Sequence, residues 1–340
     1  MMDRENFQKK ILSIDSEEGF NEIALQLFHE QASRNPVYKE YLQLIHSAPS
    51  SVLYYTQIPC LPVSFFKTQQ VSSIPLSSYH YDQAPYSAVF KSSGTTQEER
   101  SIHRIYDVRW YEKVTQEGFR IFFGDIKNYV IIACLPSYYD NKESSLLYMV
   151  NHFIALSENP LSGYYDFSSD RLGEVLEACQ ITGKKAWIIG VTYALLDWAE
   201  NNKKITLDDS TVVLETGGMK GRRKELIRSE LHERLKMGLG VAKIYSEYGM
   251  CEMLSQAYCF ENEQFEGVPW LRFGLRELND PFNSLQEGSG VIRVFDLANM
   301  DSCCFLETQD IGQRDTSGKL KILGRIDNSD IRGCNLLYQN

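Results

Sequence analysis

The chain has 340 residues, which is enough to bury a large core, so one large α/β domain with a small appendage is expected. Its hydrophobic share of 43% and charged share of 24% are those of an ordinary soluble globular protein. The formal net charge of −10 makes the surface repel phosphate backbones and anionic lipid. Composition therefore argues against a nucleic-acid partner and against a membrane-surface role.

The N-terminus and the cysteines indicate the compartment. No apolar signal core follows Met1, and the longest apolar runs, such as 130–135, are far too short to span a bilayer. None of the eight cysteines forms a Cys-x-x-Cys pair, and no histidine pair has the spacing of a metal-binding helix. Several cysteines, such as Cys134, lie in apolar strands, where a reduced thiol is usual. We expect a cytoplasmic protein with no membrane span and no zinc site.

The first part of the chain, residues 1–85, is predicted to be a helical and then irregular segment. Apolar residues at 20, 23, 24, 27 and 28 share one helix face, and Asn35-Pro36 starts a second helix, so two helices are expected within 16–46. Residues 50–80 are rich in Ser and Pro, which is typical of an irregular connection across the surface.

Residues 86–255 alternate between apolar strands and helices. The predicted strands are 87–90, 129–135, 187–190, 211–214 and 242–245, with a polar loop at 91–103. The predicted helices are 107–123, 143–156, 170–181, a segment ending near 200, and 222–237. Continuous apolar strands between helices favour a mainly parallel sheet covered on both faces, so this region is predicted to be an α/β nucleotide-binding core.

Residues 256–340 have a different pattern. Short alternating strands are predicted at 291–295 and 320–323, with turn residues between them. We therefore expect a small β-rich subdomain with a truncated C-terminus. The fold class predicted for the whole chain is α/β.

The sharpest local feature is the hydroxyl-rich segment Phe90-Lys91-Ser92-Ser93-Gly94-Thr95-Thr96. Such a loop after a strand offers backbone N–H and side-chain O–H donors to an anion, and its glycine lets the backbone approach closely. It is not a Walker A loop, because no Gly-Lys-Ser/Thr is present. Taken alone, the segment fits an ordinary Ser/Thr turn equally well.

Three further segments follow it along the chain: Tyr245-Ser246-Glu247-Tyr248-Gly249-Met250-Cys251-Glu252, Glu307-Thr308-Gln309-Asp310 and Gly324-Arg325-Ile326-Asp327. In order and spacing, the four segments resemble the ANL superfamily of adenylate-forming enzymes. That superfamily includes acyl-CoA ligases, luciferase and the adenylation domains of peptide synthetases. The resemblance implies the adenylating N-terminal core of that superfamily as the fold.

Within that superfamily, the chain resembles the acyl-protein synthetase family, which includes the synthetase subunit of the fatty-acid reductase of bacterial luminescence. The segments that carry this resemblance are 92–96 with Ser101 and His103, 216–221, 246–250 with 254–258, and 332–336. It covers roughly residues 16–340. The resemblance implies a ligase that uses ATP to activate a carboxylic acid as acyl-AMP and transfers the acyl group to a cysteine thiol of itself or of a partner protein. It favours a fatty acid as the substrate.

The resemblance also implies roles for individual residues. The β- and γ-phosphates of ATP would be wrapped by Ser92, Ser93, Gly94, Thr95 and Thr96, whose donors stabilise the charge of the leaving pyrophosphate.

The rest of the implied nucleotide site lies later in the chain. Gly217 and Gly218 would flank adenine, and Tyr248 would stack on it beside Gly249. Asp310 would accept from the ribose hydroxyls, and Glu252 would hold Mg²⁺, which prefers one or two carboxylates plus phosphate oxygens. Arg325 would lie on the ribose-phosphate side. Outside these motifs, each residue has an ordinary structural explanation as well.

Two residues have more open roles. In the resembling family a C-terminal cysteine receives the acyl group, which points to Cys334, and the neighbouring Arg332 would favour its thiolate. The alternative is a free cysteine packed under the small subdomain. His103 either contacts the acyl-phosphate or is a structural residue.

The chain departs from the superfamily pattern at several points. Residues 97–100 replace the usual Gly-x-Pro-Lys, Cys251 replaces a threonine, and Gln309 replaces a glycine. Fifteen residues follow Arg325, where most of the superfamily has a lid of about a hundred residues, so no full lid domain is expected. This favours transfer to a protein thiol, in the chain or on a partner protein.

Other functions stay open. The chain is alternatively an acyl- or aryl-CoA ligase, a ligase that loads an acyl carrier protein, or a weakly active nucleotide-binding subunit that needs a partner. The 20 Tyr and 17 Phe residues permit an apolar acyl chain. An aryl acid is also open, because phenylacetate-CoA ligase shares the same core.

Overall fold

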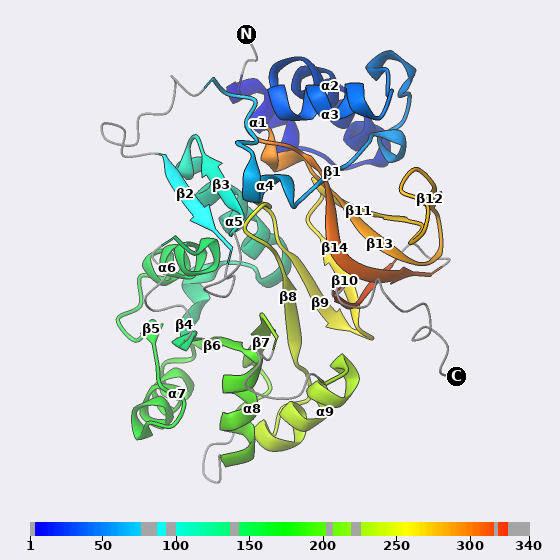
Figure 1. The fold of residues 1–340 in the computed structure, drawn as a ribbon. Coiled ribbons are helices and arrows are strands. Elements are labelled where there is room, and N and C mark those ends of the chain that lie inside the picture. The colour runs from blue at the N-terminus through cyan, green and yellow to red at the C-terminus, as the bar shows by residue number, and fades with distance from the viewer. Residues whose placement is uncertain are drawn as a thin grey trace.

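The computed structural model describes residues 4–75, 87–92, 100–136, 143–201, 207–218, 226–315 and 319–325. A long mixed sheet runs through this part of the chain, and helices lie against it (Figure 1). The predicted fold class, α/β with a large sheet flanked by helices, is confirmed. Within the described residues no helix is both long enough and apolar enough to cross a membrane.

One half of the sheet is parallel. Its strands are β4 (Tyr129–Cys134), β6 (Lys185–Val191), β7 (Val212–Thr216) and β8 (Tyr245–Tyr248), with the short β5 (Gly163–Tyr164) at the edge. The side chains of β4 and β7 are buried throughout, which explains the continuous apolar sequence of β4 and of residues 212–214 in β7, since helices cover a parallel sheet on both faces.

The other half of the sheet is antiparallel. It contains β9 (Ala257–Glu261), β10 (Gln264–Gly267), β11 (Leu271–Arg276), β12 (Ser284–Leu285), β13 (Gly288–Asp296), β14 (Phe305–Arg314) and β15 (Leu320–Arg325), and β1 (Leu61–Pro62) pairs with β14 in parallel. Strand β8 joins the halves, because it pairs with β7 in parallel and with β9 in antiparallel fashion. The predicted strands at 291–295 and 320–323 are confirmed, and both are longer than expected.

Five helices flank the parallel half: α5 (Val108–Phe123), α6 (Ser145–Ser157), α7 (Asp170–Thr182), α8 (Thr192–Asn201) and α9 (Arg228–Leu239). Side-chain caps fix two of the starts: Asp107 accepts from the backbone N–H of Arg109, and Ser144 accepts from that of Leu147. Glycine in the left-handed conformation ends α7 and α9. The predicted helices are confirmed, although α9 begins later than position 222.

The N-terminal helices pack on the antiparallel half. They are α1 (Arg4–Leu12), which the sequence did not predict, α2 (Glu17–Arg34) and α3 (Pro36–Leu44). The Gln31 side chain donates to the backbone carbonyl oxygens of Asn299 (3.2 Å) and Met300 (3.1 Å). These buried bonds join the beginning of the chain to a segment near its end.

Shorter elements connect these parts. They are the 3-10 turns η1 (Pro49–Ser51), η2 (Tyr55–Gln57), η4 (Ile126–Asn128) and η6 (Leu297–Asn299) and the short helix α4 (Phe65–Thr68). A separate two-stranded sheet is formed by β2 (Ala88–Lys91) and β3 (Ile102–Ile105). The prediction of a polar loop over 91–103 is therefore wrong at its end. The alternation in β3 places His103 and Ile105 on the buried side.

The prediction of a strand at 242–245 is wrong by three residues. Strand β8 begins at Tyr245, because Ala242 and Lys243 are exposed, and it continues through Ser246, Glu247 and Tyr248. These polar residues stay in the strand because β9 pairs with them. The motif residues expected after the strand are thus part of it.

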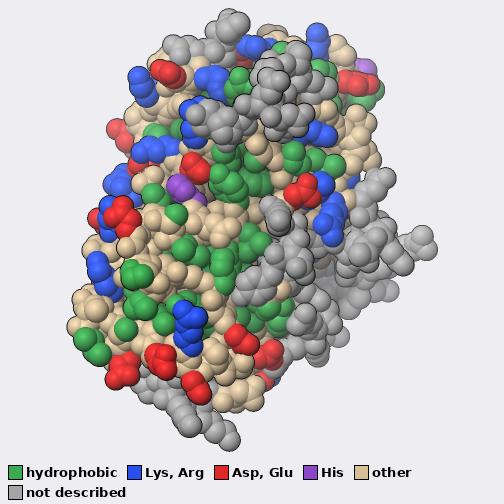
Figure 2. Space-filling view, turned by 90° about the vertical axis from the view of Figure 1, so that its left-hand side faces the viewer, with side chains coloured by type: hydrophobic (Ala, Val, Ile, Leu, Met, Phe, Trp, Pro, Cys, Tyr) green, Lys and Arg blue, Asp and Glu red, His purple; other side chains and the backbone are tan. Residues whose placement is uncertain are grey.

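Figure 2 shows the face on the left of Figure 1, on the side of α6 and α7. Apolar side chains gather down the middle of this face, and most charged side chains lie along its edges. Because more than half of a folded protein's surface is apolar, this distribution does not by itself mark a site.

Helices α8 and α9 touch at Gly238. A Cβ atom there would lie 2.5 Å from the Ala199 carbonyl oxygen, so Gly238→Ala forces the helices apart. We expect the free energy of unfolding, measured by urea titration, to fall by about 1–3 kcal/mol.

Gly118 of α5 is the matched control, because a Cβ atom there would meet only Val268 at 3.5 Å. Gly118→Ala should be neutral or stabilising by up to about 1 kcal/mol through helix propensity. Equal effects of the two substitutions would contradict the close packing of α8 on α9.

Candidate functional site

The candidate residues gather where the parallel strands end. Thr192 follows β6, Gly217 and Gly218 follow β7, and Tyr248 closes β8. The carboxyl ends of neighbouring parallel strands open at one edge of a sheet, which is the usual place for ligands in α/β folds. A ligand site is therefore expected at this edge.

Tyr248 and Asp310 form a direct bond across the two halves of the sheet. The Tyr248 hydroxyl donates to the Asp310 carboxylate at 2.7 Å, although 62 positions separate them in sequence. Burial raises the pKa of Asp310, while the Tyr248 bond and the charge of Arg325 act in the opposite direction. Arg325 lies opposite Asp310 in the pairing of β14 with β15.

Arg325 ends the last described strand. Its guanidinium donates to the Gln309 side chain at 3.0 Å, and its charge acts on both Asp310 and Glu252. One cation thus lies near the two carboxylates that the sequence assigned to ribose and to the metal.

Glu252 lies in a turn between β8 and β9. Its side chain is buried, and burial raises the pKa of the carboxyl, opposed first by a hydrogen bond from Ser101. The backbone carbonyl of Glu252 accepts from the Asn299 amide at 2.7 Å, which fixes the turn. Within the described ranges, Glu252 forms no ion pair within salt-bridge distance, so its carboxylate is a suitable ligand for a hard cation.

Ser92 leads from β2 toward the predicted phosphate loop. Its hydroxyl accepts from the Ser101 backbone N–H at 3.0 Å, and its own N–H donates to the Ser101 carbonyl at 3.1 Å. Ser101 in turn contacts Cys251 and Glu252, so the start of the loop lies beside the Glu252 turn. The other predicted loop residues, Ser93, Gly94, Thr95 and Thr96, and the predicted acyl acceptor Cys334 lie outside the described residues.

His103 is buried next to the Glu252 turn. Its ring is 1% exposed, and Nδ1 lies 2.8 Å from the Cys251 carbonyl oxygen. Phe66 packs edge-on against it at 5.4 Å. Burial lowers the pKa of His103 to about 4, so the ring is neutral at pH 7. This environment favours a role in positioning the turn over contact with an acyl-phosphate.

Gly217 and Gly218 both have positive φ, of 82° and 70°. Only glycine adopts this conformation without strain, which explains the glycine pair. The Gly218 N–H donates to the Thr192 hydroxyl at 3.1 Å, and that hydroxyl donates to buried Glu215 at 2.9 Å. These hydrogen bonds therefore hold the turn that is expected beside adenine.

Sequence reasoning missed Glu247. Its carboxylate accepts from the Thr216 hydroxyl at 2.6 Å, and a Cβ atom at Gly249 would lie 2.6 Å from its other oxygen. Burial raises the pKa of Glu247 to about 7. Side chains alternate along a strand, so Glu247 points away from the face on which Tyr248 meets Asp310. No local pattern indicated its role, because the predicted strand ended at 245 and Glu247 was placed after it.

Asp296 was also missed. This buried carboxylate accepts from the backbone N–H groups of Leu254 (2.8 Å) and Ser255 (2.9 Å) and from the Ser255 hydroxyl (2.6 Å). The bonds hold the segment that follows Glu252 against the end of β13. The sequence gives no sign of it, because a single aspartate at the end of a strand is ordinary.

The described candidates therefore lie in one connected region: Ser92, Gly217, Gly218, Tyr248, Gly249, Glu252, Asp310 and Arg325. Its groups are suited to a ligand with hydroxyls, a planar ring and negative charge. Carboxylates accept from hydroxyls, a tyrosine ring stacks, and backbone N–H groups meet anions.

Comparison with solved structures places the fold. A 2-hydroxyisobutyryl-CoA ligase, solved in its postadenylation state with 2-HIB-AMP, superimposes with a TM-score of 0.63 at 14% sequence identity, over 92% of this chain and 68% of that one. ATP-bound MatB from Rhodopseudomonas palustris gives a TM-score of 0.52 at 15% identity, over 70% of this chain and 48% of that one. The chain thus spans about half the length of MatB.

The sequence matches no protein-family model and no curated protein. At these identities the structural similarity establishes the fold alone. That fold is the one shared by these acyl-adenylate and ATP complexes of ligases.

Glu247 gives a pH-dependent prediction. Its pKa in the folded protein is about 7 against an ordinary value of 4.5, so the cost of the buried charge is absent below pH 4.5 and complete above about pH 7. Wild-type stability therefore loses this contribution as the pH rises through that window.

Glu247→Gln keeps an acceptor for Thr216 and removes the titration. We expect the variant to gain on the order of 1–3 kcal/mol relative to wild type between pH 5 and pH 8, measured by urea unfolding at both values. A stability difference that is the same at both pH values would rule out a raised pKa at this carboxyl.

Proposed function

We propose that this protein uses ATP to activate a carboxylic acid as an acyl-adenylate and then transfers the acyl group to a thiol. The observation that carries the proposal is the contact between Tyr248 and Asp310, beside the glycine pair 217–218, at the ends of the parallel strands. Its support from outside the chain is the shared fold with ligases solved with ATP or an acyl-adenylate.

In this proposal the chain binds the nucleoside through three groups. The backbone at Gly218 and the Tyr248 ring contact adenine, and the Asp310 carboxylate accepts from the ribose hydroxyls. Asp310 is already oriented by the Tyr248 hydroxyl at 2.7 Å, so little side-chain freedom is lost on binding.

The chemical step is an in-line displacement at the α-phosphorus. A carboxylate oxygen of the acid forms the new P–O bond, the bond to pyrophosphate breaks, and the electron pair leaves with pyrophosphate. Donors of the loop that begins at Ser92 would stabilise the charge on pyrophosphate, and Arg325 would lie near the ribose-phosphate.

Glu252 is the residue that would hold Mg²⁺ together with phosphate oxygens. It fits this role because its carboxylate is buried without an ion pair in the described part of the chain, so a bound cation would offset the cost of burying the negative charge. Bound Mg²⁺ would neutralise phosphate charge. His103 would act as a positioning residue through the Cys251 carbonyl.

The proposal also includes the class of acid and the acyl acceptor. We infer a fatty acid as substrate and Cys334, or a cysteine of a partner protein, as the acceptor, on the motif resemblance. Coenzyme A is the second candidate acceptor, because a structural neighbour is a CoA ligase. An aryl acid, an acyl carrier protein as acceptor, and a subunit active only with a partner are the remaining alternatives.

Acid-dependent ATP–pyrophosphate exchange tests adenylation directly. With a panel of fatty and aryl acids, we expect exchange with one acid class. Asp310→Ala should lower kcat/KM for ATP by roughly 10–100-fold, because charge-assisted bonds to the ribose are lost. Tyr248→Phe keeps the ring and should cost less.

Asp280→Asn is the matched control, because it removes an exposed carboxylate from a loop outside the site and should leave exchange unchanged. If no acid in the panel supports exchange although ATP binding is measurable, the chain does not adenylate acids on its own. That result would favour the subunit that needs a partner.

Mass spectrometry after turnover tests the acceptor. If Cys334 receives the acyl group, the wild-type chain carries an acyl adduct and Cys334→Ser does not, while exchange persists because adenylation precedes transfer. An adduct that survives in Cys334→Ser would exclude this cysteine. Exchange with no adduct in the wild type would move the acceptor to coenzyme A or to a partner protein.

A further inference from the structure

The Glu247 carboxylate lies next to the candidate site, on the other face of the sheet. Side chains alternate along β8, so Tyr248 is on the face where it meets Asp310, and Glu247 is on the opposite face. The carboxylate accepts from the Thr216 hydroxyl at 2.6 Å, and Thr216 immediately precedes Gly217. Both chain segments of the expected nucleoside site therefore lead directly to this carboxylate.

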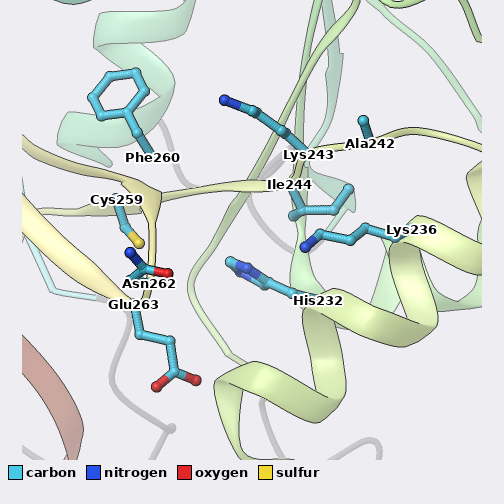
Figure 3. Close-up of a pocket in the computed structure, with 9 residues that line it drawn as sticks. All are labelled: His232, Lys236, Ala242, Lys243, Ile244, Cys259, Phe260, Asn262 and Glu263. Atoms are coloured by element: carbon cyan, nitrogen blue, oxygen red, sulfur yellow. The ribbon is translucent and has the colours of Figure 1, made fainter.

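Helix α5 lies against the face to which Glu247 belongs. In the pairing of β8 with β9, Glu247 lies opposite Tyr258, and residues in such a pair share one face, with Cβ atoms about 5 Å apart. The rings of Tyr258 and Phe260 pack against Phe122 of α5 at 5.1 and 5.4 Å. Figure 3 shows Phe260 leaving β9 on one side and Cys259 leaving it on the other, toward α9. Glu247 and Tyr258 are therefore on the α5 side of the sheet.

One oxygen of the Glu247 carboxylate is left without a donor. The Thr216 bond uses the other oxygen. The remaining oxygen lies over Gly249, where an added Cβ atom would be only 2.6 Å away from it. Among the residues that the structure describes, no donor bonds to this oxygen. It is thus an available acceptor, located at the end of β8 beside the candidate site.

The Glu247 side chain is more accessible than the tyrosines near it. Tyr111 and Tyr258 are each 1% exposed, whereas Glu247 is only partly buried. Burial and the charge of Glu247 both raise the pKa of these two tyrosines, so the carboxylate lies near both phenol groups. A ligand can therefore reach a carboxylate whose neighbours are enclosed.

The two tyrosine hydroxyls differ in their partners. The Tyr111 hydroxyl donates to the Ser145 backbone carbonyl at 3.1 Å. The Tyr258 hydroxyl forms no hydrogen bond within the described part of the chain, although a buried hydroxyl usually has a partner. A free acceptor on Glu247 and a free donor on Tyr258 therefore occur on one face, in directly opposite residues of two strands.

A hydroxyl group of a ligand suits this pair. It can donate its proton to the carboxylate oxygen and, with its own oxygen, accept from the phenol. An ammonium group can donate to Glu247 but cannot accept from Tyr258. An apolar chain can do neither, and it would leave both polar groups unpaired, which costs free energy.

We propose that the acid activated by this protein carries a hydroxyl group on its acyl part, and that Glu247 and Tyr258 bind this hydroxyl and select for it. The inference rests on the function proposed above and names the class of acid more closely. The nucleoside would occupy the Tyr248 face, and the acyl part would pass the end of β8 toward α5. Glu247 is then a residue that determines substrate specificity.

Acid-dependent ATP–pyrophosphate exchange with matched acids tests this selection. The probes are butanoate, tetradecanoate and benzoate, each compared with its hydroxy and amino derivatives. Measurement at pH 8 keeps Glu247 ionised, because burial raises its pKa to about 7. We expect kcat/KM for one hydroxy acid to exceed that of its parent acid at least about tenfold, because a site that bonds a hydroxyl rejects the analogue without it. The amino derivatives should not share this advantage.

Substitutions then locate the selection. Glu247→Gln should reduce the preference for the hydroxy acid at least about fivefold, because the amide has one acceptor oxygen and Thr216 already donates to it. Tyr258→Phe removes only the phenol donor and should reduce the preference less. Tyr165→Phe is the matched control, because its hydroxyl donates to the Leu161 carbonyl at 2.6 Å near the edge strand β5. It should leave the preference unchanged.

The outcomes separate this inference from the proposed function. Exchange with equal kcat/KM for the members of every pair would overturn the hydroxyl inference and leave adenylation intact. A preference that persists in Glu247→Gln would assign the hydroxyl to other residues, and a preference for an amino derivative would assign an ammonium group; either result overturns the proposal. If no acid supports exchange, the proposed function fails, and the inference that rests on it fails as well.

Discussion

The pairing of β8 with β9 is the constraint on which the candidate site depends. Strand β8 is parallel to β7 on one side and antiparallel to β9 on the other, so one sheet passes from a parallel to an antiparallel half at this point. Without that transition Tyr248, which ends the parallel half, would not meet Asp310, which belongs to β14. The carboxylate of Asp296 reinforces the junction, because it holds the segment between β8 and β9 by its backbone N–H groups.

The sequence predicts best where one physical signal dominates. Strand β4 is apolar throughout and buried, and helix α6 has a serine cap and an apolar face, so both were recognised. The bounds of β8 were predicted wrongly because Ser246 and Glu247 are polar. In the structure, pairing with β9 and the hydrogen bond from Thr216 to Glu247 accommodate these residues in the strand. Motif order placed Tyr248 and Asp310 in one predicted nucleotide site, but their direct contact was not predicted. The support by Asp296 depends on tertiary packing that no local pattern contains.

The site is built from carboxyl groups that burial makes reluctant to ionise. Burial raises the pKa of Glu252 and of Asp310, opposed by a hydrogen bond from Ser101 to Glu252 and by one from Tyr248 to Asp310. Such groups cost free energy in the empty protein when charged, and a ligand that brings hydroxyls or a cation offsets that cost. Because the protein itself does not fully satisfy these carboxylates, their hydrogen bonds to a ligand would contribute directly to its binding free energy.

Glu215 connects the turn at Gly218 with the inner face of α9. One of its oxygens accepts from Thr192, which holds Gly218, and the other faces His232 and Arg228. Burial would raise its pKa, but the hydrogen bond from His232 and the charge of Arg228 lower it overall. Substitutions at Thr192 and at His232 therefore each remove a partner of the same buried carboxylate. Their effects on the free energy of unfolding are not expected to be additive. Through Glu215, the energetics of the two ends of β8 are therefore coupled.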